Sequence, residues 1–253
     1  MHVIGVIGFA LLGGVLASFL GVVAERVYTG QSWIRDRSRC NSCSEPLGWR
    51  DLLPVLSFVT TFGRARCCGA RLPWTYVASE FLLGVVFALA YLKLGLGVPL
   101  LVFLLAILTL AFIILYDLRH TVVPLAASSV LMVLSLGFAW LSSRAIPEFG
   151  LTLSVAGFVG LFFFLFYAFS RGRAMGLGDA PVALSLALLV GPYLALPGLL
   201  FSFWIGAAVG IAILVGRPKG HRMGIEVPFV PFLAAGFLLA YFTQWNPLLL
   251  QLS

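Results

Sequence analysis

The chain has 253 residues, of which 61% are hydrophobic and only 10% are charged, and its formal net charge is +7. A soluble domain is about half apolar and about a quarter charged, so this composition excludes an ordinary water-soluble domain and favours a protein that spans a membrane. The basic residues lie between apolar runs and form no stripe interleaved with aromatic residues, so a nucleic-acid partner is not expected.

Eight apolar segments follow one another along the chain, and each approaches the length of about 20 residues that a membrane-spanning helix needs. Glycine, proline or charged residues stand at the breaks between them, and such residues end helices. The pattern predicts an all-α, polytopic membrane bundle of about eight transmembrane helices. In chain order we expect them at residues 3–24, 75–92, 98–116, 122–141, 151–169, 180–196, 198–215 and 229–243. Only Pro197 and Gly198 separate the sixth from the seventh.

A polar segment, residues 25–74, interrupts the apolar pattern after the first helix. It is basic and rich in cysteine, proline and glycine. Because it is too short to bury a normal core, we expect a metal, disulfides or a partner to stabilise it. The sequence therefore divides into a first transmembrane helix at 1–24, a small cysteine-containing insertion at 25–74, and a transmembrane bundle at 75–253.

The basic residues also indicate an orientation, because loops on the cytoplasmic side carry an excess of Lys and Arg. If the N-terminus faces outward, all of the 16 Lys and Arg residues except Lys93 and Arg144 belong to the cytoplasmic side. This asymmetry supports an even number of helices with both termini outside.

All four cysteines lie in the insertion, which we expect to be cytoplasmic. Cys40 and Cys43 form a C-x-x-C pair, whereas Cys67 and Cys68 are adjacent. Ala65 stands where a regular second pair would begin. Thiolates bind zinc tetrahedrally, so all four cysteines are candidate ligands of a structural zinc site, and disulfides are not expected in the cytoplasm. The alternatives are one C-x-x-C pair with two small buried thiols, or a redox pair, although no thioredoxin-like pattern surrounds it.

Two aspartates stand at expected membrane boundaries, where an ionisable group is costly and therefore a candidate for function. Asp117 ends the third expected helix, and Asp179 opens the sixth, after Gly176-Leu177-Gly178. In the expected orientation both lie at the cytoplasmic edge of the bilayer. Two neighbouring carboxyls share a proton, so one can take a proton from water while the other donates to a carbonyl oxygen, as peptide hydrolysis requires. Gly176 and Gly178 would let a substrate backbone approach closely.

Each acid also has a simpler interpretation. Asp179 can cap the N-terminus of its helix. Asp117 opposes the dipole at a helix C-terminus and can pair locally with Arg119 or His120. Glu80, near the start of the second expected helix, can complement the helix dipole, line a polar cleft or pair with an arginine.

Several motifs occur along the chain in an order that is more specific than any one of them. They are residues 16–20 of the first helix, Cys40 to Cys43 followed by 49–58, Tyr76 with Glu80, residues 116–120 with Pro124, the G-x-G-D run at 176–179, and residues 227–232. Together they resemble the type IV prepilin peptidases, also called leader peptidase/N-methyltransferases, which are GxGD-type aspartic membrane proteases. The resemblance covers nearly the whole chain.

The resemblance implies an intramembrane aspartic endopeptidase with Asp117 and Asp179 as its catalytic pair. Such enzymes remove the short basic leader of type IV prepilins or pseudopilins at the cytoplasmic face of the bacterial inner membrane, after a glycine and just before the hydrophobic helix. Many also methylate the new N-terminus with S-adenosylmethionine, and the cysteine-bearing domain is implicated. The chain departs from the family pattern at Ala65 and at Pro181, where the family often has lysine, but it keeps both aspartates.

Two other classes of function fit the same composition. A transporter or channel can relay protons or ions through two membrane acids, although the sequence suggests neither duplicated halves nor matched broken helices. A non-catalytic component of a pilus or secretion assembly would use neither acid in chemistry.

Overall fold

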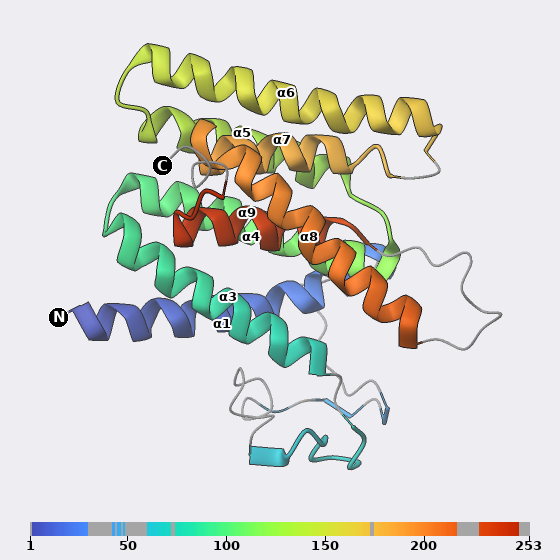
Figure 1. Cartoon of the computed structure of the whole chain (residues 1–253). Helices are drawn as coiled ribbons and strands as arrows, with labels where there is room; N and C mark the ends of the chain where they lie inside the picture. Colours follow the sequence, from blue (N-terminus) through green and yellow to red (C-terminus); the bar gives the residue numbers. More distant parts are fainter. Residues whose placement is uncertain are drawn as a thin grey trace. The chain divides into compact units, whose positions relative to one another are not determined.

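The computed structural model describes residues 2–29, 42–43, 45–46, 48, 60–71, 74–172, 175–216 and 228–247. Across these ranges the chain is helical, apart from its turns and an isolated antiparallel bridge between Arg64 and Arg71, so the expected all-α class is confirmed (Figure 1). The chain divides into two compact units, Met1–Leu100 and Leu101–Ser253.

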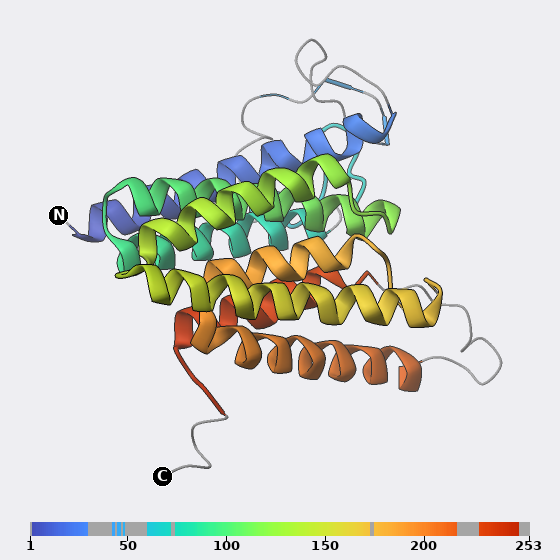
Figure 2. The same ribbon diagram turned by 90° about the horizontal axis from the view of Figure 1, so that it is seen from above.

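The first unit contains α1 (His2–Thr29) and α3 (Trp74–Leu94), which lie side by side (Figures 1 and 2). Glycines allow this close approach. A methyl group added to Gly13 of α1 would lie 2.7 Å from the carbonyl oxygen of Leu83, and one added to Gly84 of α3 would lie 2.8 Å from that of Ala10. Helices in lipid associate through such small residues, because the two backbones then come into van der Waals contact.

The second unit is built around α7, a short helix that is apolar on nearly all sides. Ten of its 12 residues are buried, because α5, α6, α8 and α9 all pack against it. A helix without a polar face needs such an enclosure. The helices of this unit are α4 (Val98–His120, which enters it at Leu101), α5 (Leu125–Ser142), α6 (Ile146–Ser170), α7 (Asp179–Val190), α8 (Pro192–Gly216) and α9 (Val230–Thr243).

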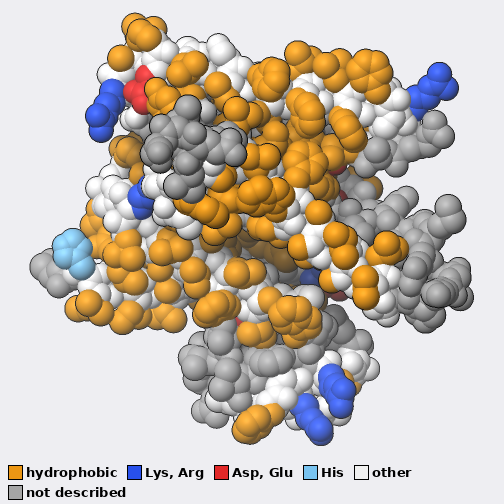
Figure 3. Space-filling model, viewed as in Figure 1, with side chains coloured by type: hydrophobic (Ala, Val, Ile, Leu, Met, Phe, Trp, Pro, Cys, Tyr) orange, Lys and Arg blue, Asp and Glu red, His pale blue; other side chains and the backbone are white. Residues whose placement is uncertain are grey.

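The surface of the helices matches lipid better than water. Of the described helices, six are long and apolar enough to cross a membrane, whereas α7 and α9 are apolar but shorter. Hydrophobic side chains cover most of the visible helical surface in the space-filling view (Figure 3). Exposed apolar area on this scale is not found on soluble monomers. The chain is therefore an integral membrane protein.

The boundary between the sixth and seventh expected helices is wrong. The break lies at Gly191, not at Pro197 and Gly198, and Pro197 is inside α8. Gly191 has a φ of 84°, which favours glycine, and Pro192 supplies the fixed φ that suits the first residue of the next helix. Gly191 and Pro192 therefore indicate the helix boundary better than Pro197 and Gly198 do.

Two helix starts also differ from expectation. The fourth was expected from residue 122 but begins at Leu125, because Pro124 has an extended backbone (φ −69°, ψ 118°) and does not continue a helix from α4. The fifth was expected from residue 151 but begins at Ile146, since Pro147 lies in the first turn, where its missing N–H costs no hydrogen bond.

The contact between α1 and α3 predicts that Gly13→Ala lowers the thermal stability of the purified protein in detergent. The added methyl would meet backbone atoms of α3, and overpacking of this kind costs about 1–3 kcal/mol. Gly8→Ala is the matched control, because no atom lies within 4 Å of the position its methyl would take. Thermal unfolding of the two variants measures the difference, and equal melting temperatures would contradict the tight contact.

Candidate active site

Asp117 lies in the last turn of α4 and is only 5% exposed. The backbone N–H of Val230, the first residue of α9, donates a hydrogen bond to its carboxyl group. The Oδ2 atom of Asp117 is buried and finds no hydrogen-bond partner among the described residues. A buried carboxyl oxygen without a partner is rare in a structural role, because burial without a hydrogen bond is costly.

Asp179 is the first residue of α7 and is 7% exposed. Its Oδ2 atom accepts a hydrogen bond from the backbone N–H of Gly176 at 3.2 Å, and its own N–H donates to the Gly176 carbonyl at the same distance. The N-cap position belongs to Gly178, and no side chain caps the helix there. The alternative interpretation of Asp179 as an N-cap is therefore wrong.

The two carboxyl groups are neighbours. Burial raises the pKa of Asp179, which lies just outside the six helices long enough to span the membrane, and the nearby charge of Asp117 raises it further. The hydrogen bond from Gly176 opposes both effects, and the resulting pKa of Asp179 is about 6. The charge of Asp117 makes ionisation of Asp179 more costly, so the pair holds at least one proton below a pH of about 6.

Three helix ends meet at this pair. The C-terminus of α4 contributes Asp117, the N-terminus of α7 contributes Asp179, and the N-terminus of α9 contributes the Val230 N–H. The partial positive charge of a helix N-terminus stabilises an anion, whereas a helix C-terminus disfavours one. The ends of α7 and α9 therefore offset the unfavourable location of Asp117 on α4.

Sequence reasoning missed two contributors to this site. One is the N–H of Val230, a backbone group that leaves no mark in a sequence pattern. The other is Val123, against which Gly178 packs so closely that a methyl group on Gly178 would lie 2.5 Å from the Val123 Cβ. Pro124 could have indicated that Val123 lies in an extended segment outside a helix, because proline disfavours helical backbone at the residue before it.

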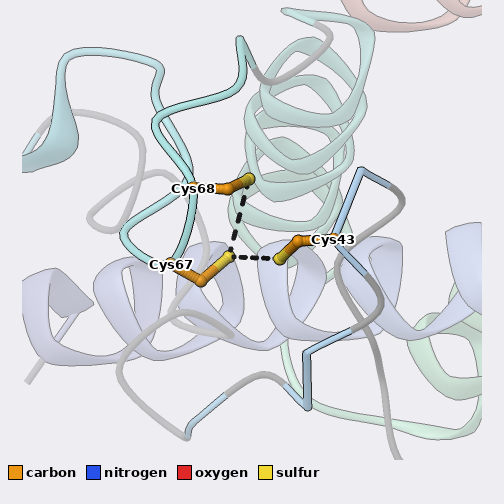
Figure 4. Close-up of side chains that lie close together, drawn as sticks. All are labelled: Cys43, Cys67 and Cys68. Carbon is orange, nitrogen blue, oxygen red and sulfur yellow. Dashed lines mark hydrogen bonds between the residues drawn. The ribbon is translucent and has the colours of Figure 1, made fainter.

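Three of the four cysteines form a cluster in the first unit. The Sγ atoms of Cys43 and Cys67 are 3.2 Å apart, those of Cys67 and Cys68 are 3.8 Å apart, and all three lie within 4.8 Å of one another (Figure 4). They are exposed, so the interpretation of Cys67 and Cys68 as small buried thiols is wrong. Cys40 lies outside the described residues.

A tight turn explains how two adjacent cysteines reach the same partner. The N–H of Ala65 donates to the Ala70 carbonyl, and the N–H of Gly69 donates to the Ala65 carbonyl, each at 2.8 Å. Gly69 adopts a φ of 69°, which glycine tolerates best. Thiolates bound tetrahedrally to zinc at about 2.3 Å lie roughly 3.8 Å apart, so the spacing of Cys67 and Cys68 matches this geometry and that of Cys43 and Cys67 is shorter.

Glu80 lies on α3 in the first unit, half-buried, one helical turn beyond Tyr76. A methyl group added to Gly21 of α1 would contact the Tyr76 ring at 3.6 Å, so this part of α3 faces α1. Glu80 thus belongs to the unit that does not contain the aspartates.

Taken together, the fold and the site define a polytopic membrane protein with two buried carboxyl groups whose charges interact. Residues 11–94 match the bacterial peptidase A24 N-terminal domain, and residues 101–211, which include both aspartates, match the type IV leader peptidase family. The first match lies within the first compact unit and the second within the other. The chain belongs to the type IV leader peptidase family.

Relatives over most of the chain support this membership. A prepilin leader peptidase/N-methyltransferase of Klebsiella pneumoniae is 31% identical over 199 residues, which cover 75% of this chain and 86% of the relative. Proteins of the same name from Bacillus subtilis and Dickeya chrysanthemi are 29% and 28% identical, and the alignments cover 91% and 93% of both chains, respectively. No solved structure matches this chain significantly.

The family confirms the expected class of enzyme, a membrane protease, and the relatives carry the additional name N-methyltransferase. It does not favour the transporter or the non-catalytic assembly component.

The neighbouring charges predict a specific titration. Infrared spectroscopy of purified protein with isotope-labelled aspartate should show the Asp179 carboxyl protonated until the pH rises through about 6. Asp117→Asn should lower this midpoint, because it removes a neighbouring charge, but not to the ordinary value of 3.8, because burial remains. Asp179→Asn identifies the band. A midpoint that is unchanged by Asp117→Asn would contradict the proximity of the two groups.

Proposed function

We propose that this protein cleaves the leader from type IV prepilins or pseudopilins with Asp117 and Asp179 as its catalytic pair. The observation that carries the proposal is the mutual proximity of two buried carboxyls, one of which has an oxygen without a hydrogen-bond partner among the described residues. Family membership supports the same reaction, because both aspartates lie in the matched residues.

In the proposed reaction the pair begins with one proton. The ionised carboxyl takes a proton from a water molecule, whose oxygen attacks the carbonyl carbon of the scissile peptide bond. The protonated carboxyl donates its proton to the carbonyl oxygen, so that a neutral tetrahedral intermediate forms. When it collapses, the C–N bond breaks, the protonated carboxyl gives its proton to the leaving amine, and the ionised carboxyl takes a proton from a hydroxyl of the intermediate. The pair is then left with one proton again. The two carboxyls titrate as a coupled pair, so the roles of acid and base are assigned to the pair and not to one aspartate each.

The proposed substrate is a chain with a short basic leader followed by an apolar helix. The apolar helix would enter from lipid, since the helical surface of the enzyme is itself apolar. We propose that the backbone of Gly176 and Gly178 borders the scissile bond, since residue 176 brings no side chain that would fill the space around it. Glu80 would attract the basic leader, which otherwise meets an enzyme with a net charge of +7.

We further propose that the protein resides in the bacterial inner membrane with the aspartate pair at the cytoplasmic face. The distribution of Lys and Arg supports this orientation. Residues 1–24 would form the first membrane helix, 25–74 the cytoplasmic insertion and 75–253 the catalytic bundle.

A structural zinc ion is the proposed metal of the insertion. Cys43, Cys67 and Cys68 fit three thiolate positions of a tetrahedral site, and Cys40 is the proposed fourth ligand. Zinc would join two parts of an insertion that is too short to bury a normal core. S-adenosylmethionine is the proposed methyl donor, because the relatives are named N-methyltransferases.

Replacement of either aspartate should abolish leader cleavage. With a purified prepilin in detergent or liposomes, Asp117→Asn and Asp179→Asn should each lower the rate by about 10⁴-fold, because members of a catalytic unit fail together. Glu148→Gln, an acid-to-amide change in the same unit, should cleave like wild type. Normal cleavage by either aspartate variant would remove the pair from the mechanism, and a solute flux lost in the same variants would indicate a transporter.

The insertion should bind about one zinc ion per chain. Elemental analysis of the purified protein should find this zinc lost in Cys43→Ser and retained in Ser42→Ala, its neighbour in sequence. Loss in Cys67→Ser and in Cys68→Ser would show that both adjacent thiolates are ligands. Wild-type protein that contains no zinc when purified without chelators would contradict the assignment.

A further inference from the structure

The connection between α4 and α5, residues 121–124, packs against the loop that precedes α7. A methyl group added to Gly178 would lie 2.5 Å from Cβ of Val123 and 3.1 Å from each of its Cγ atoms. These distances are shorter than ordinary van der Waals contact, so Val123 occupies the space that any side chain at residue 178 would need. The nearest atom is the Cβ itself, which cannot rotate away.

We infer that Val123 is a positioning residue that sets the separation of the two carboxyl groups. Val123 follows shortly after Asp117, and Gly178 immediately precedes Asp179. Their contact therefore joins the two segments that carry the aspartates, which α5 and α6 otherwise separate along the chain. The inference rests on the proposed catalytic role of the pair and adds a residue to it.

The segment that carries Val123 is tied to the end of α4. The N–H of Thr121 donates to the Asp117 carbonyl at 2.8 Å, and Thr121 turns the chain with a φ of 51°. Pro124 then restricts Val123 to extended backbone. Val123 is thus connected to Asp117 through a short and restrained stretch of chain.

The segment that carries Gly178 is tied equally closely to Asp179. The N–H of Gly176 donates to the Asp179 carboxyl, and the N–H of Asp179 donates back to Gly176, each at 3.2 Å. A displacement of Gly178 away from Val123 is therefore passed to the Asp179 carboxyl. Misplacement of a reacting group by about 1 Å costs about 100-fold in rate.

The test adds a methyl group on one side of the contact and removes side-chain atoms on the other. Gly178→Ala adds a Cβ, and the partner is then trimmed in two ways. Val123→Ala keeps the Cβ with which the new methyl collides, whereas Val123→Gly removes it. Glycine is also compatible with the extended backbone before Pro124. Gly157→Ala on α6 is the control, because no atom lies within 4 Å of the position its methyl would take.

The variants are compared by the kcat and KM of prepilin cleavage by the purified enzyme. Gly178→Ala lowers kcat by about 100-fold with little change in KM, because binding of the substrate helix is not what the carboxyl spacing controls. Combining it with Val123→Gly restores kcat to within about tenfold of wild type, whereas combining it with Val123→Ala does not. Gly157→Ala leaves both constants unchanged. Gly178→Ala with normal kcat, or equal kcat in the two double variants, would overturn the inference.

The test also holds if Gly178→Ala accumulates poorly. The yield of folded protein then becomes the measured quantity, and the Val123→Gly combination should restore it where the Val123→Ala combination does not. Equal yields would overturn the inference. Its failure is separate from failure of the proposed function, since Asp117→Asn and Asp179→Asn would still abolish cleavage if Val123 had no role.

Discussion

Two carboxyl groups buried side by side in an apolar bundle are the constraint on which this structure depends. Like charges at close range cannot both form without cost, and burial in the protein raises that cost. The chain offsets the cost with backbone groups, namely the N–H of Gly176 toward Asp179 and that of Val230 toward Asp117. Both donors come from loops or helix ends, so backbone groups of the second unit stabilise the two acids.

Much of this arrangement could be predicted from the sequence. Long apolar runs separated by Gly, Pro and charge gave the helices, and two acids at run boundaries gave the candidate pair. The predicted helix break at Pro197 is wrong, because proline inside a membrane helix is tolerated when neighbouring helices enclose it. Gly191 breaks the chain instead, since its positive φ ends α7 outright.

The contacts between distant segments could not be predicted. Val123 is unremarkable in sequence and Gly178 stands out only as part of the G-x-G-D run, so only the folded chain shows that Val123 fills the space beside Gly178. The cysteines illustrate the same limit. Adjacent Cys67 and Cys68 look irregular beside a regular C-x-x-C pair, but the turn closed by Ala65 and Gly69 brings their sulfurs to Cys43. Spacing rules for metal ligands assume the turn of a C-x-x-C pair, whereas the turn here is closed by hydrogen bonds of Ala65 and Gly69.

The contact from α9 to Asp117 bears on how the protein is made. Membrane helices are inserted as they leave the ribosome, so α4 and α7 reach the bilayer well before α9 is synthesised. Until then, Asp117 lacks the Val230 N–H that stabilises its charge. The hydrogen-bond donor of Asp117 therefore arrives only with α9, the last described helix of the chain.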